Sequence, residues 1–303
     1  MLNLVGGIAE SQTQGVPVLA LVGQTPLQQE GVGGFQDSSG TGSLIDSLQL
    51  WQSITQYTTK ITNASLFWQE FKLCLWHSIN GAMGATAMLL PRDVMTLDVG
   101  EMPNDFIRCL RPSVYINQAS FIKDITVIVN MLSGCRRPLL IVGEGVTKEP
   151  CTTSLHQFIS QTNIAVASTL GDLAVVDQSS AQYLGCVGVA GHPSVHQFIN
   201  EEVDLVIAVG TALDAMTIAP VADILAALPL IIVNRRLAQV NSQLKPSCLL
   251  SCDSDSFFKA LLNVLNDVPL KYEGLDHYQQ VRQPVVHWPD KLRQQSCSGL
   301  SQY

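Results

Sequence analysis

The stretch P-L-L-I-V-G-E-G, residues 138–145, decides the fold class. Its first five residues form a short apolar run, which is typical of a strand buried on both faces of a parallel sheet. The glycines at 143 and 145 follow directly and are typical of the turn at the end of such a strand. The stretch D-L-V-I-A-V-G-T at 204–211 has the same order. Both stretches therefore predict strands of an open α/β sheet, in which ligands lie beyond the carboxyl ends.

On either side of these stretches, segments of strand type alternate with segments whose apolar residues recur at helical spacing. Further strands are expected at 164–167, 230–233 and 247–250, and helices at 121–132, 154–161, 195–202, 217–227 and 255–265. This alternation implies right-handed crossovers and a parallel sheet that is covered on both faces. Residues 111–270 are therefore predicted to form one doubly wound, Rossmann-like domain.

The first 110 residues show the same alternation with fewer strands. Helices are expected at 2–14, where Gly15 stops the helix, and at 66–79, and strands at 18–22 and 86–90. Residues 31–42 are rich in glycine and serine and predict a long loop of the kind that often carries function. Because these strands are too few to close a sheet, residues 1–110 are predicted to be part of a second α/β domain. Residues 271–303 are expected to be a linker or tail.

The composition limits the possible functions. A chain of 303 residues is long enough for about two domains, and 47% hydrophobic against 14% charged residues exclude a disordered protein. A net charge of −8 without a Lys/Arg cluster argues against nucleic acid and anionic membranes as partners. The longest apolar stretch, 218–233, is interrupted by Pro220, Asp223 and Pro229, so it is not expected to span a membrane.

The eight cysteines form no C-x-x-C pair of the kind that zinc and redox sites use. Because the N-terminus carries no secretion signal, they are expected to be reduced thiols in a cytoplasmic protein. No metal site is predicted from the histidines either. His192 and His196 are four residues apart, but Pro193 lies between them and the glutamate of an H-E-x-x-H motif is missing.

Three groups of residues are candidates for ligand contact. Phe35-Gln36-Asp37 places an aromatic ring, an amide and a carboxylate in the long loop, where no core needs them. Arg92 follows a strand end and could bind an anionic group or pair with a surface carboxylate such as Asp93. The glycines at 143 and 145 could offer backbone amides to a phosphate. They do not form G-x-G-x-x-G, however, so a plain turn is the favoured interpretation.

Taken in order, several segments resemble those of thiamine diphosphate-dependent enzymes of the acetolactate synthase large-subunit type. The segments are N-L-V-G-G-I-A (3–9), P-V-L-A-L-V-G-Q (17–24), F-Q (35–36), L-L-P-R-D-V (89–94), R-R-P-L-L-I-V-G (136–143) and D-L-V-I-A-V-G-T-A-L-D (204–214). The resemblance implies part of a pyrimidine-binding domain at 1–110, followed by the Rossmann-like central domain at 111–270.

The resemblance also implies an activity. Enzymes of this type are transferases that decarboxylate a 2-oxo acid such as pyruvate and join the two-carbon unit to an acceptor. They use thiamine diphosphate with Mg²⁺ and work as homo-dimers or tetramers. Six residues match positions near the active site: Asn3, Gly7 and Gln24 at the pyrimidine edge of the cofactor, and Phe35, Gln36 and Arg92 in a loop at the dimer interface and at the substrate entrance.

Two family motifs have no counterpart in these segments: the one with the catalytic glutamate, and the G-D-G…N motif that holds Mg²⁺ and the diphosphate. No catalytic or metal-binding residue is therefore assigned, and the chain is expected to be truncated and inactive alone. A non-catalytic remnant and a nucleotide-binding module are the alternatives.

The FAD that synthases hold in the central domain is also expected to bind poorly. Ala212 stands where an arginine is common, and Asn234-Arg235-Arg236 replaces an acidic pair at the end of the next strand. An acid there accepts hydrogen bonds from ribose hydroxyls, which arginine cannot do because it has no acceptor.

Overall fold

The structure is a computed structural model that describes residues 1–80, 83–110, 118–147, 152–201, 203–267 and 269–272. The chain divides into two compact units, Met1–Val114 and Tyr115–Tyr303, which are described separately here. The tail expected at 271–303 lies outside the described residues, except for Lys271 and Tyr272. Within the described residues, every helix is too short or too polar to cross a bilayer.

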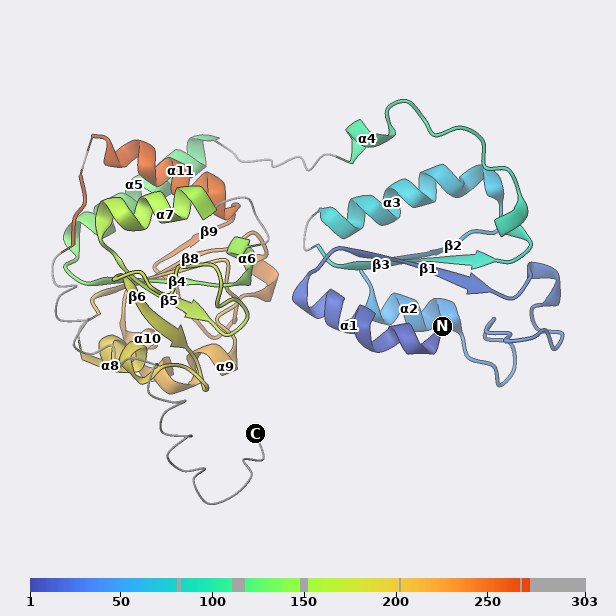
Figure 1. Cartoon of the computed structure of the whole chain (residues 1–303), viewed down its shortest axis with the longest axis horizontal. Coiled ribbons are helices and arrows are strands. Elements are labelled where there is room, and N and C mark those ends of the chain that lie inside the picture. The colour runs from blue at the N-terminus through green and yellow to red at the C-terminus, as the bar shows by residue number, and fades with distance from the viewer. Residues whose placement is uncertain (81–82, 111–117, 148–151, 202, 268, 273–303) are drawn as a thin grey trace, which may run out of the picture. The chain divides into compact units, whose positions relative to one another are not determined.

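The Met1–Val114 unit is a three-layered α/β structure. Its parallel sheet has the order β1-β3-β2, with β1 at Val18–Gln24, β3 at Ala85–Pro91 and β2 at Tyr57–Lys60. Helices α1 (Val5–Gln14) and α2 (Ser47–Ile54) cover one face, and α3 (Phe67–Ile79) covers the other (Figure 1). The shorter elements are η1 (Leu2–Leu4), η2 (Leu27–Gln29), η3 (Ala64–Leu66), η4 (Val94–Thr96) and α4 (Phe106–Cys109).

Side-chain alternation in β3 explains the two layers of helices. Ala85, Ala87 and Leu89 point to one face, where they pack with Ile8 of α1 and Trp51 of α2. Met88 points to the other face and packs with Cys74 of α3 and Ile61. Strand β3 is therefore buried on both faces, as its continuous apolar sequence predicts.

The Tyr115–Tyr303 unit contains a six-stranded parallel sheet with the order β6-β5-β4-β7-β8-β9. The chain starts at β4, adds β5 and β6 on one side, then returns to add β7, β8 and β9 on the other. This is the doubly wound order that the sequence predicts. The strands are β4 (Pro138–Val142), β5 (Ala165–Thr169), β6 (Tyr183–Val187), β7 (Leu205–Val209), β8 (Leu230–Val233) and β9 (Cys248–Leu250).

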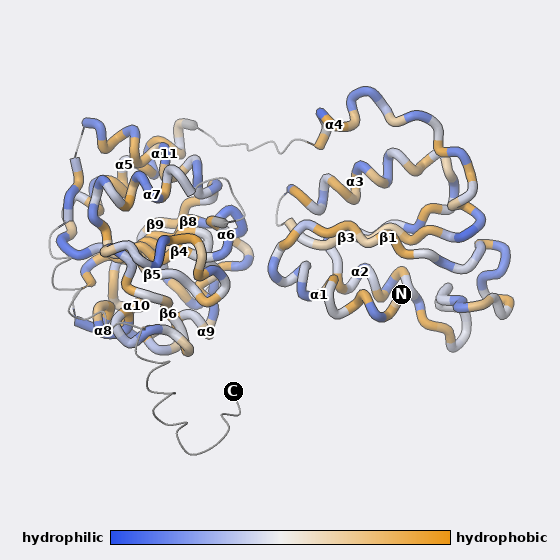
Figure 2. The backbone as a smooth tube through the Cα atoms, in the orientation of Figure 1, coloured by the Kyte–Doolittle hydropathy of each residue, from blue (hydrophilic) through white to orange (hydrophobic). Residues whose placement is uncertain are grey.

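Helices cover both faces of this sheet (Figure 1). Its strands are therefore buried on both faces, and they are the most hydrophobic part of the unit (Figure 2). Leu140 and Val142 of β4 belong to the core beneath α5, α7 and α11, whereas Leu139 and Ile141 belong to the core on the opposite face. The helices are α5 (Gln118–Gly134), α6 (Glu144–Thr147), α7 (Thr152–Thr162), α8 (Pro193–Glu201), α9 (Ala215–Ile218), η5 (Ala219–Val221), α10 (Ala222–Ala227), η6 (Leu237–Gln239) and α11 (Ser254–Leu265).

The prediction of a single helix at 217–227 is wrong. The structure has α9, a short 3-10 turn and α10 in its place, because Pro220 has no backbone N–H to continue a helix. The helix α2, the strands β2 and β6, and several short helices have no counterpart in the sequence prediction. Strand β6 contains Gly185 at φ 121° and β2 is a half-buried Y-T-T-K segment, so neither shows a continuous apolar run.

Candidate functional site

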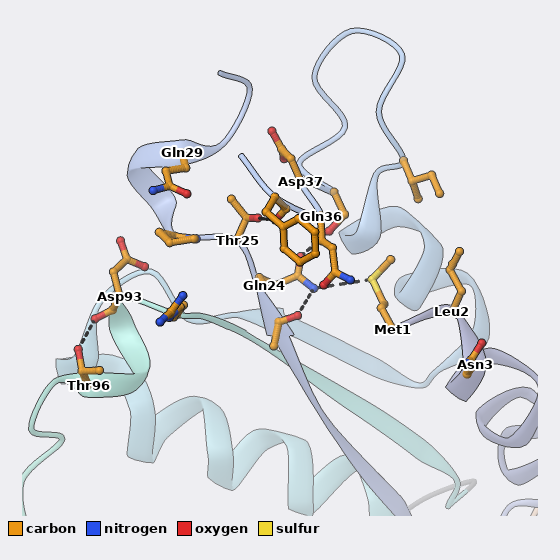
Figure 3. A pocket seen from close by; sticks show the side chains of 16 residues that line it. Met1, Leu2, Asn3, Gln24, Thr25, Gln29, Gln36, Asp37, Asp93 and Thr96 are labelled. Carbon is orange, nitrogen blue, oxygen red and sulfur yellow. Dashed lines mark hydrogen bonds between the residues drawn. The ribbon is translucent and has the colours of Figure 1, made fainter. Parts of the chain in front are cut away.

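A pocket of about 940 Å³ lies at the carboxyl ends of β1 and β3. We call it the Gln24 pocket, after the last residue of β1 (Figure 3). Because β1 and β3 are parallel neighbours, their carboxyl ends meet at one edge of the sheet, and the loop after β1 folds over that edge. Its lining consists of Met1, Leu2, Asn3, Gly23, Gln24, Thr25, Pro26, Gln29, Phe35, Gln36, Asp37, Ser38, Ile45, Arg92, Asp93 and Thr96.

Five of the six site residues that the sequence suggests line this one pocket: Asn3, Gln24, Phe35, Gln36 and Arg92. They come from four separate segments of the chain, which the fold brings together. The sixth, Gly7, lies on an exposed part of α1 and is not among the lining residues. The pocket therefore brings together five of the six residues. The predicted roles of all six residues stay predictions.

The loop that carries Phe35 and Gln36 is fixed at its base. The Thr25 hydroxyl donates a 2.6 Å hydrogen bond to the backbone oxygen of Phe35. Gly34 packs so closely that a Cβ there would lie 2.8 Å from the Gln29 backbone oxygen, and Gln36 has a φ of 54°. The Phe35 side chain nevertheless remains 85% exposed. The loop thus holds an aromatic ring in solvent, where it contributes little to the core of its own unit.

Two serines fix the amide group of Gln24. Its Oε1 accepts hydrogen bonds from the hydroxyls of Ser38, at 2.8 Å, and Ser47, at 2.9 Å. Its Nε2 lies 3.2 Å from the Gly23 backbone oxygen and 3.7 Å from the Met1 sulfur, a weak acceptor. Sequence reasoning missed both serines, which lie in the long loop and at the start of α2.

Both carboxylates that line the pocket accept hydrogen bonds from backbone amides. Asp93 accepts from Leu27, at 3.1 and 3.2 Å, and from Val94 at 3.1 Å. Asp37 accepts from Gly31 at 2.6 Å and from Ser39 at 3.0 Å. Desolvation acts to raise the pKa of Asp37, but these backbone hydrogen bonds outweigh it, so the pKa is lowered and the group stays ionised. Both carboxylates thus hold loops in place.

Arg92 is held by its backbone and not by its side chain. Its N–H donates a 3.1 Å hydrogen bond to the Gln24 backbone oxygen, which continues the register of β3 against β1. Its guanidinium is exposed and makes no ion pair within the described part of the chain. The sequence left open a pairing with Asp93, but that carboxylate accepts backbone amides instead. Arg92 therefore offers the pocket a cation.

The turns at the switch point of the larger sheet pack against each other. The Gly145 N–H donates to the Gly210 backbone oxygen at 2.8 Å, and the Gly143 N–H donates to Val209 at 3.0 Å. A Cβ at Gly143 would lie 2.6 Å from the Thr211 Cβ, and one at Gly145 would lie 2.8 Å from the Gly210 backbone. Close packing of two turns therefore accounts for these glycines without a phosphate, which favours the plain-turn interpretation.

The side chain of Asn234, just after β8, is engaged within the protein. Its Nδ2 donates to the Thr211 backbone oxygen at 2.9 Å, and its Oδ1 accepts from the Arg236 N–H at 2.8 Å. Asn234 is buried, so this amide serves as a link between two turns. A neutral, buried amide that already bonds to both turns is a poorer acceptor for a ribose hydroxyl than the acid that the sequence lacks at this position.

The free cysteines of the described residues lie outside the Gln24 pocket. Cys74, Cys135, Cys186, Cys248 and Cys252 form no disulfide. Burial, together with the nearby Glu70 carboxylate, raises the pKa of Cys74 to about 12. Burial and Asp204 raise the pKa of Cys135 to about 11. Neither thiol forms the thiolate that nucleophilic or redox chemistry needs.

The described residues do not form a complete thiamine diphosphate site. The pocket offers amide and guanidinium donors, but its two carboxylates are held by backbone amides. No group of three or more His, Cys, Asp or Glu side chains that could hold a metal ion occurs within the described ranges. These residues fit a small ligand that accepts hydrogen bonds. They do not fit the diphosphate and its Mg²⁺.

A doubly wound domain preceded by an α/β unit with a polar pocket is the architecture that the thiamine enzyme resemblance implies. Residues 125–261 match the family model of the thiamine pyrophosphate enzyme central domain. This part of the chain is therefore similar to the central domain of thiamine diphosphate-dependent enzymes, and the curated relatives of the chain are acetolactate synthases.

Its relatives include the acetolactate synthase isozyme 2 large subunit of Escherichia coli, which is 25% identical over 92% of this chain and 48% of the relative. The acetolactate synthase large subunit of Corynebacterium glutamicum is 27% identical over 70% of this chain and 32% of the relative. A probable acetolactate synthase large subunit of Methanococcus aeolicus is 25% identical over 69% and 34%. The chain thus spans less than half the length of these relatives.

Proposed function

We propose that this chain takes part in a thiamine diphosphate-dependent carboligation of the acetolactate synthase type, in which a 2-oxo acid such as pyruvate is decarboxylated. The observation that carries the proposal is the Gln24 pocket, which gathers five of the six residues that the resemblance selects. The fold and the relatives support the same class of reaction.

In this proposal the described residues bind and orient the substrate. Arg92 has a free guanidinium, which matches a carboxylate with two parallel hydrogen bonds. Gln24 adds amide donors from the floor of the pocket, and the Phe35 ring supplies an apolar wall. The carboxylates of Asp37 and Asp93 remain bound to loop amides, so they keep the walls in place. We assign no step to thiamine diphosphate or Mg²⁺, because the described residues do not complete their sites.

Two further parts of the proposal concern assembly and location. The 85% exposed Phe35 supports a homo-dimer or tetramer, in which this loop contacts a second copy. Sedimentation of the wild type and of Phe35→Ser tests it, because the loss of an apolar anchor should shift the variant toward monomer. The free thiols support a cytoplasmic location.

The proposed binding of a 2-oxo acid is tested by isothermal titration calorimetry of the purified chain with pyruvate. Arg92→Gln should weaken binding about 10- to 100-fold, which corresponds to the loss of charge-assisted hydrogen bonds worth about 1.5–3 kcal/mol. Arg108→Gln is the matched control, because Arg108 is an exposed arginine of α4 in the same unit that does not line the pocket. Wild-type-like binding by Arg92→Gln contradicts the assignment of Arg92. If the wild type does not bind pyruvate, the non-catalytic alternative is favoured.

A further inference from the structure

The Gln24 side chain shows which kind of atom its pocket can accept. A glutamine amide has an acceptor end and a donor end, and its two orientations differ by a rotation of the amide group. In the Gln24 pocket, the partners of the acceptor end settle this choice. Both partners are buried: Ser38 is 8% exposed and Ser47 is 3% exposed.

The reverse orientation removes the acceptor of two buried hydroxyl protons, which would then have to turn toward other acceptors. The Ser38 and Ser47 hydroxyls both donate to Gln24 Oε1, and this oxygen has two lone pairs, so the pair of bonds uses its acceptor capacity. With the amide reversed, both hydroxyls would face an NH₂ group. A buried donor without an acceptor is costly, which favours the observed orientation. The backbone supports the same arrangement, because the Ser47 N–H donates to the Ser38 oxygen at 3.0 Å.

We infer that Ser38 and Ser47 are positioning residues that lock the Gln24 amide with its NH₂ group toward the pocket. The pocket then selects, at this position, a ligand atom that accepts a hydrogen bond. Gln24 Nε2 donates to the Gly23 oxygen and to the Met1 sulfur, and a ligand oxygen would replace the sulfur, which is the weaker acceptor. Arg92 supplies further donors, so the ligand class is a small oxo acid with carboxylate and carbonyl oxygens. The identity of the ligand rests on the function proposed above, whereas the locked orientation does not.

Gln24→Glu tests the donor without disturbing the serines. A glutamate carboxylate accepts both serine hydroxyls as the amide oxygen does, but it has no N–H and carries a negative charge. This variant should fold and unfold like the wild type and bind pyruvate at least about tenfold more weakly. Wild-type affinity in Gln24→Glu overturns the donor role.

The double variant Ser38→Ala/Ser47→Ala tests the lock itself. The readout is the ¹⁵N relaxation of the Gln24 side-chain amide, whose signal is identified by its absence in Gln24→Glu. Without ligand, this amide should be rigid in the wild type and mobile on the picosecond to nanosecond timescale in the double variant. Pyruvate affinity should fall about three- to tenfold, because binding must then order the side chain.

Ser53→Ala is the matched control, because the Ser53 hydroxyl bonds only locally, to Leu50 in the same helix α2. It should leave both the relaxation and the affinity unchanged. A rigid Gln24 amide in the double variant overturns the positioning role of the serines. If the wild type does not bind pyruvate, the proposed function fails. The ligand-free relaxation still decides whether the serines lock the amide.

Discussion

Gly143→Ala separates the two explanations for the glycines at the switch point of the larger sheet. Gly143 is buried directly after β4, and a Cβ there would lie 2.6 Å from the Thr211 Cβ and 2.7 Å from the Gly210 backbone oxygen. The turn would have to move, because one of the two clashing atoms belongs to the backbone. Overpacking of this kind costs about 1–3 kcal/mol. This should lower the Tm of the Tyr115–Tyr303 unit by roughly 3–10 °C.

Gly134→Ala provides a matched control in the same unit. Gly134 is exposed at the end of α5, and nothing lies within 4 Å of the added Cβ. The substitution should be neutral or stabilise the unit by up to about 1 kcal/mol, because alanine loses less backbone entropy than glycine. Thermal unfolding followed by far-UV circular dichroism measures both variants. Three of the four tryptophans, Trp51, Trp68 and Trp76, belong to the Met1–Val114 unit, and the fourth, Trp288, lies outside the described residues. Tryptophan fluorescence of a Trp288→Phe background therefore reports on the Met1–Val114 unit alongside.

If close packing explains why residue 143 is a glycine, Gly143→Ala must lower the Tm of the protein even when no ligand is present. Wild-type unfolding of Gly143→Ala, with no nucleotide present, would refute the packing argument. The turn would then have room for a side chain, and close approach of a phosphate would become the better reason for glycine. The nucleotide-binding alternative would gain support from that result.

Three further outcomes are expected. Limited proteolysis should cut the exposed loop at 31–42 first and leave a core of about 115–270. Preferential survival of the first 110 residues would contradict the predicted domain boundaries. Calorimetric titration should show no micromolar binding of FAD, because Ala212 replaces an arginine and both ends of the Asn234 amide bond to neighbouring turns. ADP is titrated for comparison. Micromolar or tighter FAD binding would contradict this interpretation. The purified chain with thiamine diphosphate and Mg²⁺ should not consume pyruvate, because the two carboxylates among the described lining residues, Asp37 and Asp93, are bound to backbone amides and are not placed to relay a proton. Pyruvate turnover above a cofactor-free blank would contradict this expectation.

The fold of the larger unit could be predicted from the sequence because its strands are buried on both faces. Such strands show uninterrupted apolar runs, and the predicted bounds of β4 and β8 agree with the structure residue for residue. The elements that were missed carry no such run. Strand β2 is half-buried along its whole length, and β6 is interrupted by a glycine. Their place in the sheet depends on tertiary pairing, which a short window of sequence does not contain.

The site could be predicted only where residues belong to recognisable segments. Gln24 and Arg92 stand in such segments, and the structure brings them to one pocket. The residues that hold the pocket together act over long distances in sequence. Ser38 and Ser47 reach Gln24 across 14 and 23 residues, and Asp93 reaches Leu27 across 66. No local pattern marks a serine whose partner lies two elements away.

The two sheets differ in how the polar groups at their carboxyl ends are used. At the switch point of the larger sheet, the Gly145 N–H and both ends of the Asn234 amide bond to neighbouring turns. In the Met1–Val114 unit, Gln24 Nε2 donates to the adjacent Gly23 oxygen at 3.2 Å and to the Met1 sulfur, a weak acceptor, at 3.7 Å, and the Arg92 guanidinium is exposed. A ligand gains most where donors are already oriented and binding breaks few internal bonds, as at the exposed Arg92 guanidinium and at the Nε2–Met1 contact, whose sulfur is a weak acceptor. Among the described residues, we therefore expect small-molecule recognition at the end of β1 and a structural role for the glycine turns of the larger sheet.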